Sequence, residues 1–320
     1  MDGLNQYISG FERRFRAIEG RSPLTVKSYC KKIENFLQWF ASERRSPDNG
    51  QHLPTRQDIE AYLEYCFYRG NKNSTRLTKL IALHKFFTHL AYEGVVKEDI
   101  MVNIPRPRAN KGGVQKFMKK EIIKIFKMID VVTEVGVRDV VILILAVFAG
   151  LRIGEIVRLN LHDVMDENGE LDINIIDTKW GSNRVVYLWK SPSIFIRRWL
   201  TIRISQGAGS TDPLLVSYKK GNTPTRQRLT PVGITKKIKM YADKAKTKKP
   251  IVNMHMFRAT HASDLRHIKG YDVFAIAERL GHRNISTTEI YIPSRGRVHK
   301  EYASLAAYWQ DFNHVWDKKE

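Results

Sequence analysis

The sequence predicts a mainly α-helical fold with a small β-sheet, divided between two domains. The chain has 320 residues, and at roughly 150 residues per domain this length favours two domains. Hydrophobic residues make up 42% of the chain, which is enough to give each domain a core. Apolar residues follow helical spacing in most segments, and in one central segment they alternate as they do in a strand.

The first domain, expected over residues 1–104, is predicted to contain helices only. One helix begins at Ser22-Pro23, because serine can cap a helix and proline is tolerated in its first turn. Thr55 precedes a second helix, and a third follows Ser74-Thr75 and ends near Gly94. Their apolar faces comprise Val26, Tyr29, Ile33, Phe36, Leu37, Phe40, Ile59, Tyr62, Leu63, Cys66, Leu77, Leu80, Ile81, Phe87 and Leu90.

A basic linker is expected at residues 105–116, because its prolines, glycines and cations make a poor helix or strand. The second domain then covers residues 117–298, and a last helix is expected at 299–320. Lysines concentrate at 236–249, which has seven of them and one acid. This stretch is compatible both with a solvated helix face and loop and with contacts to DNA phosphates.

The second domain combines helices with a β-hairpin. Helical patterns at 119–130 and 137–149 precede two alternating stretches, 171–177 and 184–188. The Gly/Asn turn between them, Trp180-Gly-Ser-Asn183, is typical of a hairpin. Further helices are predicted from there to the end of the chain.

The chain is strongly basic, with 54 lysines and arginines, 33 acidic residues and a formal net charge of +21. Such an excess indicates a polyanionic partner, either nucleic acid or an acidic membrane surface. The membrane is disfavoured because the longest apolar run, Val140–Leu151, is too short to span a bilayer, and the first residues do not form a secretory signal. Cys30 and Cys66 form neither a disulfide framework nor a CxxC zinc site, so we expect a cytoplasmic protein.

Taken singly, the residues that could carry chemistry are weak candidates. Arg152 precedes Glu155 by three positions, as in many buried ion pairs. His255 and Arg258 share one helix face, which is common by chance. His282 could be a helix-terminal residue beside a glycine cap, and Tyr291 could be an ordinary core aromatic residue.

Together, two arginines, two histidines and a tyrosine in a basic chain suit attack on a DNA phosphate. Arginine forks bind phosphate oxygens and offset the charge of the transition state. Histidine donates hydrogen bonds or moves protons near neutral pH, and tyrosine can form a covalent intermediate. The sequence has no GxxxxGK[ST] loop and no carboxylate cluster typical of magnesium sites, and this reaction needs neither nucleotide nor metal.

The order of these residues resembles that of the tyrosine recombinase (phage integrase) family, along nearly the whole chain. The segment Ala149–Ile156 is similar to the family's first arginine box. His255–Ala262 resembles the second box, although Phe257 and Ala259 replace the leucine and second histidine that the family often has. Leu280–Tyr291 resembles the third box and keeps the nine-residue step from histidine to tyrosine.

Three further segments resemble the family. Lys179 lies where the family has a catalytic lysine on a β-hairpin. Ser22–Tyr29 and the helix from Thr75 to Gly94 resemble its helical, SAM-like core-binding domain. The resemblance therefore implies a core-binding domain and a tyrosine-recombinase catalytic domain that close as a C-shaped clamp around duplex DNA.

The resemblance also implies a mechanism. Tyr291 would attack the scissile phosphate and become joined to a DNA 3′ end, releasing a 5′ hydroxyl. Arg152 and Arg258 would hold the non-bridging oxygens, with hydrogen bonds from His255 and His282.

Lys179 is the expected general acid for the departing 5′ oxygen, and Glu155 is expected to orient the site. No cofactor or metal is expected.

The expected partner is double-stranded DNA with paired recognition sites, bound by four protomers of this chain or of this chain and a related recombinase. Because the core-binding domain is expected to begin by about residue 20, we expect a simple, Xer-type recombinase without an arm-binding domain. The apolar stripe of the last helix comprises Tyr302, Leu305, Trp309, Phe312 and Trp316. In the family such a segment docks on a neighbouring protomer, and packing on its own domain stays open.

Three alternatives remain at this point. A type IB topoisomerase or a telomere-resolving enzyme would use the same residues and differ in the topology of the product. A catalytically idle DNA-binding regulator could keep the fold without the reaction. A basic ribosome- or RNA-binding protein would leave the order of the boxes unexplained.

Overall fold

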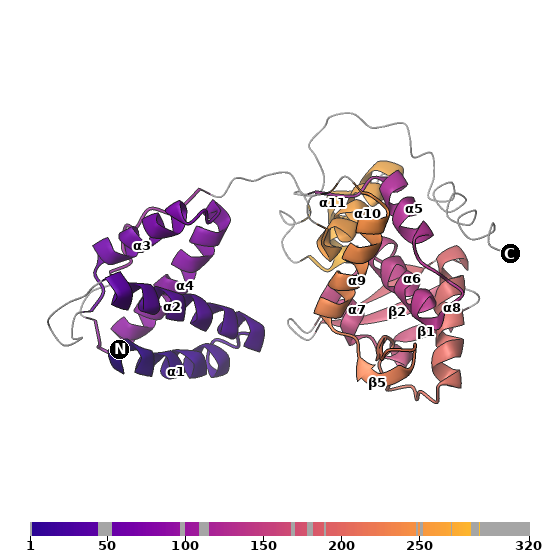
Figure 1. The fold of residues 1–320 in the computed structure, drawn as a ribbon, viewed down its shortest axis with the longest axis horizontal. Helices are drawn as coiled ribbons and strands as arrows, with labels where there is room; N and C mark the ends of the chain where they lie inside the picture. The colour runs from indigo at the N-terminus through magenta and orange to yellow at the C-terminus, as the bar shows by residue number, and fades with distance from the viewer. Residues whose placement is uncertain are drawn as a thin grey trace. The chain divides into compact units, whose positions relative to one another are not determined.

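The computed structural model divides into two compact units, Met1–Gly112 and Gly113–Glu320 (Figure 1). The structure describes residues 2–43, 53–96, 100–108, 115–167, 170–177, 182–188, 190–247, 249, 252–269, 271–282 and 288. Its mainly helical composition and small sheet confirm the predicted fold class. Among the described helices, none is both long enough and apolar enough to cross a membrane.

The first unit is a helical bundle whose core combines aromatic and aliphatic side chains. Its helices are α1 (Asp2–Ala17), α2 (Pro23–Glu43), α3 (Arg56–Tyr68) and α4 (Asn73–Tyr92). Helix α2 packs against each of the other three, and α4 also contacts α1 and α3. The Thr55 hydroxyl accepts the N–H of Asp58 at the start of α3, so the predicted cap is formed.

Helix α1 is an element of the first unit that was not among the helices predicted from the sequence. Phe11 and Phe15, one turn apart on α1, are buried in the unit's core. The Phe11 ring meets the edge of Phe86 on α4, with ring centroids 5.8 Å apart. Leu4, Ile8, Phe11 and Phe15 follow the spacing of one helix face, which is the signal for this helix in the sequence.

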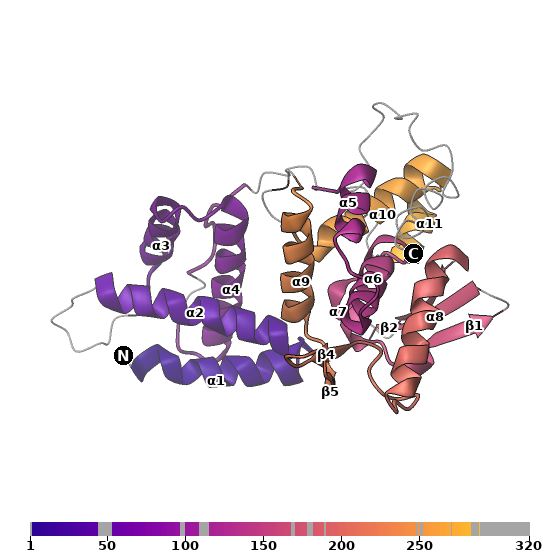
Figure 2. The same ribbon diagram turned by 45° about the vertical axis from the view of Figure 1, so that its right-hand side comes forward.

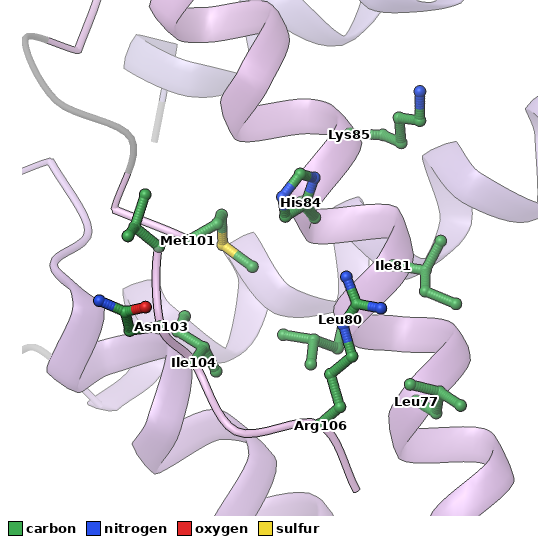
Figure 3. Close-up of a pocket in the computed structure, with 10 residues that line it drawn as sticks. Leu77, Leu80, Ile81, His84, Lys85, Met101, Asn103, Ile104 and Arg106 are labelled. Carbon is green, nitrogen blue, oxygen red and sulfur yellow. The ribbon is translucent and has the colours of Figure 1, made fainter.

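A groove of about 490 Å³ lies between α4 and the segment 101–106 of the first unit (Figure 3). Leu77, Leu80 and Ile81 line it from the helix, and the Arg106 side chain extends toward them from the segment. All the residues that line this groove belong to the first unit. It therefore contains none of the residues for which chemistry is predicted.

The second unit wraps helices around one buried helix and a three-stranded sheet. Its helices are α5 (Lys119–Lys127), α6 (Glu134–Val147), α7 (Ile153–Arg158), η1 (Leu161–Asp163), α8 (Lys190–Ser205), α9 (Pro231–Lys244), α10 (Met254–Lys269) and α11 (Val273–Leu280). Helix α6 is buried along nearly its whole length and packs against α8 and α10. Helices α10 and α11 lie together at one end of this unit in both views (Figures 1 and 2).

The main sheet has the antiparallel order β1 (Val164–Glu167), β2 (Glu170–Asp177), β3 (Ser182–Leu188). Its β2–β3 hairpin confirms the predicted one, with Ile173 opposite Val186 and Asp177 opposite Ser182. Alternate residues of β2 face the core, which explains the sequence pattern. Strand β1 and a second sheet, made of β4 (Val216–Tyr218) and β5 (Pro224–Arg228), were not predicted.

Candidate active site

The position of Arg152 is set by the tight turn that follows the buried helix α6. Gly150 follows this helix with a φ of +65°, a conformation that costs glycine little and other residues more. Arg152 then caps α7, and its backbone N–H donates to Glu155 Oε2 at 2.7 Å. The apolar run that precedes the first arginine box therefore packs in the core and fixes the turn from which Arg152 projects.

Glu155 is the centre of the site, because its buried carboxylate contacts three arginines. Arg152 Nη1 donates to Oε1 at 2.8 Å. Arg184, from β3, donates to both oxygens, at 3.2 Å from Nη1 and 3.0 Å from Nη2. Arg258, from α10, lies 3.7 Å from Oε2. Three guanidinium groups and one carboxylate leave two positive charges, which suits an anionic ligand.

The same three arginines donate to three consecutive carbonyls at the end of α11. Arg184 Nε donates to the carbonyl of Arg279 at 3.1 Å, and Arg152 Nη2 to that of Gly281 at 3.1 Å. Arg258 Nη2 donates to the Leu280 carbonyl between them. Carbonyls at the C-terminus of a helix carry partial negative charge, so this end of α11 attracts cations.

The charges around Glu155 keep its carboxyl ionised. Burial alone raises its pKa, but the hydrogen bonds and charge of Arg184, the backbone N–H of Arg152 and the charge of Arg258 outweigh burial and lower the pKa. Glu155 therefore acts as a fixed negative charge that holds the three guanidinium groups together.

His282 joins this cluster just beyond the Gly281 cap of α11, where φ is +64°. Its Nε2 lies 2.9 Å from Arg258 Nη2, and its Nδ1 lies 2.8 Å from the hydroxyl of Thr288. Because arginine only donates, Nε2 accepts and we assign the proton to Nδ1. Burial, followed by the charges of Arg258 and Arg152, lowers the pKa of His282 to about 3, so the ring is neutral at physiological pH.

His255 and Arg258 lie three residues apart on α10 but differ in exposure. Burial, followed by the charges of Arg258 and Arg152, lowers the pKa of His255, although part of the residue reaches solvent. Arg258 has no exposed surface, and its Nη1 donates to the Gly150 carbonyl at 2.6 Å. The Arg152 side chain is 37% exposed. Of the two arginines predicted for phosphate binding, Arg152 is thus the accessible one.

The structure brings five of the predicted site residues into one cluster: Arg152, Glu155, His255, Arg258 and His282. Lys179 and Tyr291 lie outside the described residues. Arg184 belongs to the cluster but was not predicted as a site residue. It stands in the segment that matches the family's lysine hairpin, yet nothing in its local pattern distinguishes it from an exposed strand arginine.

Within the described part of the chain, no group of three or more His, Cys, Asp or Glu side chains is placed to hold a metal ion. The positive charge of the candidate site comes from the guanidinium groups of Arg152, Arg184 and Arg258.

Comparison with known proteins assigns the family. Residues 115–296 match the phage integrase family, and residues 8–94 match the phage integrase N-terminal SAM-like domain. The chain therefore belongs to the phage integrase family and is an enzyme of the tyrosine recombinase class.

The chain is similar to individual members along nearly its full length. It is 26% identical to tyrosine recombinase XerC of Roseiflexus castenholzii over 99% of this chain and 98% of the relative. Its fold is similar to that of XerH recombinase bound to a palindromic difH substrate after cleavage, with a TM-score of 0.69, 21% identity, and coverage of 90% of this chain and 80% of the other. A lambda integrase tetramer bound to a Holliday junction gives a TM-score of 0.68 at 16% identity, covering 93% of this chain and 79% of the other.

Proposed function

We propose that this chain is a site-specific DNA recombinase that cleaves and rejoins DNA through a covalent 3′-phosphotyrosyl intermediate. The observation that carries the proposal is the cluster of three arginines around Glu155. Its two uncompensated positive charges are fixed before the reaction starts. They match the charge that builds on a phosphodiester under attack.

Tyr291 is the proposed nucleophile: its hydroxyl loses its proton to solvent, and its oxygen replaces the 5′ oxygen of the scissile phosphate. Arg152 meets a non-bridging oxygen first, because its side chain reaches solvent. Arg258 is buried and reaches the phosphate when its neighbours move apart. The bond energy is kept in the phosphotyrosine, so rejoining needs no nucleotide.

Protons are handled by three other residues in this proposal. Lys179 gives a proton to the departing 5′ oxygen. His255 and His282 donate hydrogen bonds to the phosphate, and His282 does so from Nε2 once Arg258 has left this atom and the ring proton has moved there from Nδ1. Glu155 stays ionised and orients the arginines, as its lowered pKa supports.

The proposed partner is duplex DNA with two inverted recognition sequences, bound by a tetramer of this chain or of this chain and a related recombinase. The lambda integrase tetramer with a similar fold supports this assembly. We keep residues 1–104, 105–116, 117–298 and 299–320 as the proposed core-binding domain, linker, catalytic domain and docking helix. The proposed location is the cytoplasm, in contact with the DNA that carries these sites.

The test is to trap a covalent complex on nicked duplexes that contain the inverted repeats flanking the gene. The wild-type protein is expected to form a detergent-resistant adduct in EDTA, because the arginines supply the positive charge. Arg152→Ala and Arg258→Ala should lose the adduct, and lysine at either position should rescue poorly because it lacks the fork. A strict need for magnesium in the chemical step would contradict the proposal.

A further inference from the structure

Arg184 makes more contacts at the site than its sequence position indicates. Its side chain is 13% exposed, and its two terminal nitrogens grip both oxygens of Glu155. Paired hydrogen bonds of this kind fix direction as well as distance, which a single lysine contact does not. Arg184 therefore fixes the plane of the Glu155 carboxylate together with Arg152, which donates to the same two oxygens from its backbone N–H and its Nη1.

The same side chain joins β3 to the end of α11. Arg184 Nε donates to the Arg279 carbonyl, and Arg279 Nη2 in return donates to the Tyr187 carbonyl of β3, each at 3.1 Å. A Cβ placed on Gly281 would lie 2.8 Å from Arg184 Nη1. The guanidinium thus fills space that glycine leaves free, directly before His282.

We propose that Arg184 is a positioning residue for DNA cleavage: it holds the Glu155 carboxylate in the orientation that keeps Arg152 and Arg258 together, and it fixes the end of α11 that precedes His282. This inference rests on the proposed function. Arg184 does not touch the reacting phosphate in this role, because its guanidinium is directed at Glu155 and at the Arg279 carbonyl.

Loss of Arg184 has a specific electrostatic consequence. Glu155 would keep Arg152 and the more distant Arg258 as partners and stay buried. The charged and titratable groups that face it are then Arg152 and Arg258, with His255 and His282 nearby. With its strongest cationic partner removed, Glu155 takes up a proton at higher pH. A protonated Glu155 no longer binds Arg152 as an ion pair, so the site loosens as the solution becomes more acidic.

The experiment measures single-turnover cleavage of a nicked duplex between about pH 5 and 8, the range in which a carboxyl of raised pKa titrates. Arg184→Gln is expected to cleave about 10- to 100-fold more slowly at neutral pH, as a small displacement of reacting groups can cause. Its rate should fall further toward acid pH, and Arg184→Lys should restore part of the rate. In the double variant Arg184→Gln/Glu155→Gln the additional fall in acid should be absent.

Arg197→Gln is the matched control. Arg197 also forms a two-pronged ion pair with a carboxylate on the same sheet, with Nη2 3.1 Å from Asp166 Oδ1, but contacts no residue of the cluster. This variant should match the wild type in rate and pH profile. Binding to a single half-site should be unchanged in all of these proteins.

Three outcomes are decisive. A wild-type rate and pH profile in Arg184→Gln would overturn the inference. The inference would also be overturned if Arg184→Gln lowered the cleavage rate by the same factor at every pH and the double variant did the same. That result would indicate a structural role only. If the wild-type protein itself forms no adduct, the proposed function fails, and the inference that rests on it fails too.

Discussion

At the scale of single residues, the turn after α6 decides where the first arginine lies. Gly150 has no side chain, and the His261 ring of α10 occupies the space where one would lie. A Cβ at Gly150 would be 2.4 Å from His261 Cδ2. His261 Nδ1 lies 2.9 Å from the Val147 carbonyl, and Arg258 holds the Gly150 carbonyl from the other side. Helix α10 therefore fixes both faces of the turn that leads to Arg152.

Gly150→Ala is expected to destabilise the protein by about 2–5 kcal/mol. The positive φ alone costs about 1–2 kcal/mol, and displacement of the His261 ring adds about 1–3 kcal/mol. Gly207→Ala is the control, because Gly207 has a φ of +76° and nothing within 4 Å of its added Cβ. Urea denaturation of both variants measures the difference, and equal losses would show that His261 does not support the turn.

His261 should also make stability depend on pH. Burial, with the charge of Arg279, lowers its pKa to about 3, below the value of about 6.5 in an unfolded chain. The unfolded state then binds the proton first, so this stabilisation is present above about pH 6.5 and is lost as the pH falls toward 3. Between pH 7 and 5 the expected loss is about 2 kcal/mol. Urea denaturation of His261→Asn should show a shallower pH dependence than the wild type, and an unchanged slope would contradict this assignment.

At the scale of elements, a buried polar network fastens α6 to its neighbours. Arg138 and Asp139 are adjacent on this helix, and Arg138 donates to Asp139 and to the Val216 carbonyl of β4. Tyr241 of α9 donates to the other Asp139 oxygen at 2.8 Å. Both oxygens of Asp139 accept hydrogen bonds, and the Arg138 guanidinium donates to Asp139 and to a backbone carbonyl. Such hydrogen bonding is the condition under which a buried ion pair is tolerated.

Tyr241→Phe should therefore reduce the unfolding free energy by about 1–3 kcal/mol, because it leaves a buried carboxylate oxygen without this donor. Lys237 Nζ lies 4.0 Å from the same Asp139 oxygen, too far to replace the lost hydrogen bond fully. Tyr187→Phe serves as the control, since Tyr187 is 55% exposed on β3. A Tyr241→Phe protein as stable as that control would show that the hydroxyl contributes nothing.

The elements also show which parts of the fold the sequence predicts. The β2–β3 hairpin was predictable because one face of β2 is buried, so apolar residues alternate along it. Strand β5 was not, because Pro224–Arg228 is largely exposed and therefore shows no alternation of apolar residues. Helix α1 was predictable as well, because its buried residues Phe11 and Phe15 follow helical spacing.

The candidate site divides in the same way. Arg152, Arg258 and His282 were predictable because each stands in a motif of fixed spacing. Arg184 was not, because its importance comes from the meeting of β3 with α7 and α11, which no local pattern encodes. Contacts between distant segments are the part of the site that needed the structure.

At the scale of the whole molecule, the proposed function requires several protomers on one DNA. The excess of positive charge over the chain provides affinity for the phosphate backbone without sequence choice. Assembly needs a further contact between protomers, and the apolar stripe near the C-terminus is the candidate that the sequence offers.

Deletion of residues 301–320 should keep the binding of one protomer to a half-site and lose cooperative assembly and recombination. The reason is that the deletion removes the apolar stripe but none of the arginine cluster. Gel-shift titration on one and on two half-sites measures both steps. Normal assembly and recombination by the shortened chain would show that the stripe packs on its own domain.

The central claim is that Tyr291 attacks the DNA phosphate without a metal ion. The most direct measurement is mass spectrometry of the tryptic peptide that carries nucleotide after cleavage in EDTA. Trypsin cuts after Arg283 and Arg295, so the peptide 284–295 contains Tyr291 and no other tyrosine. We expect the nucleotide on this peptide, joined through its 3′ phosphate. Nucleotide on the peptide that contains Tyr302, or no labelled peptide unless magnesium is added, would contradict the claim.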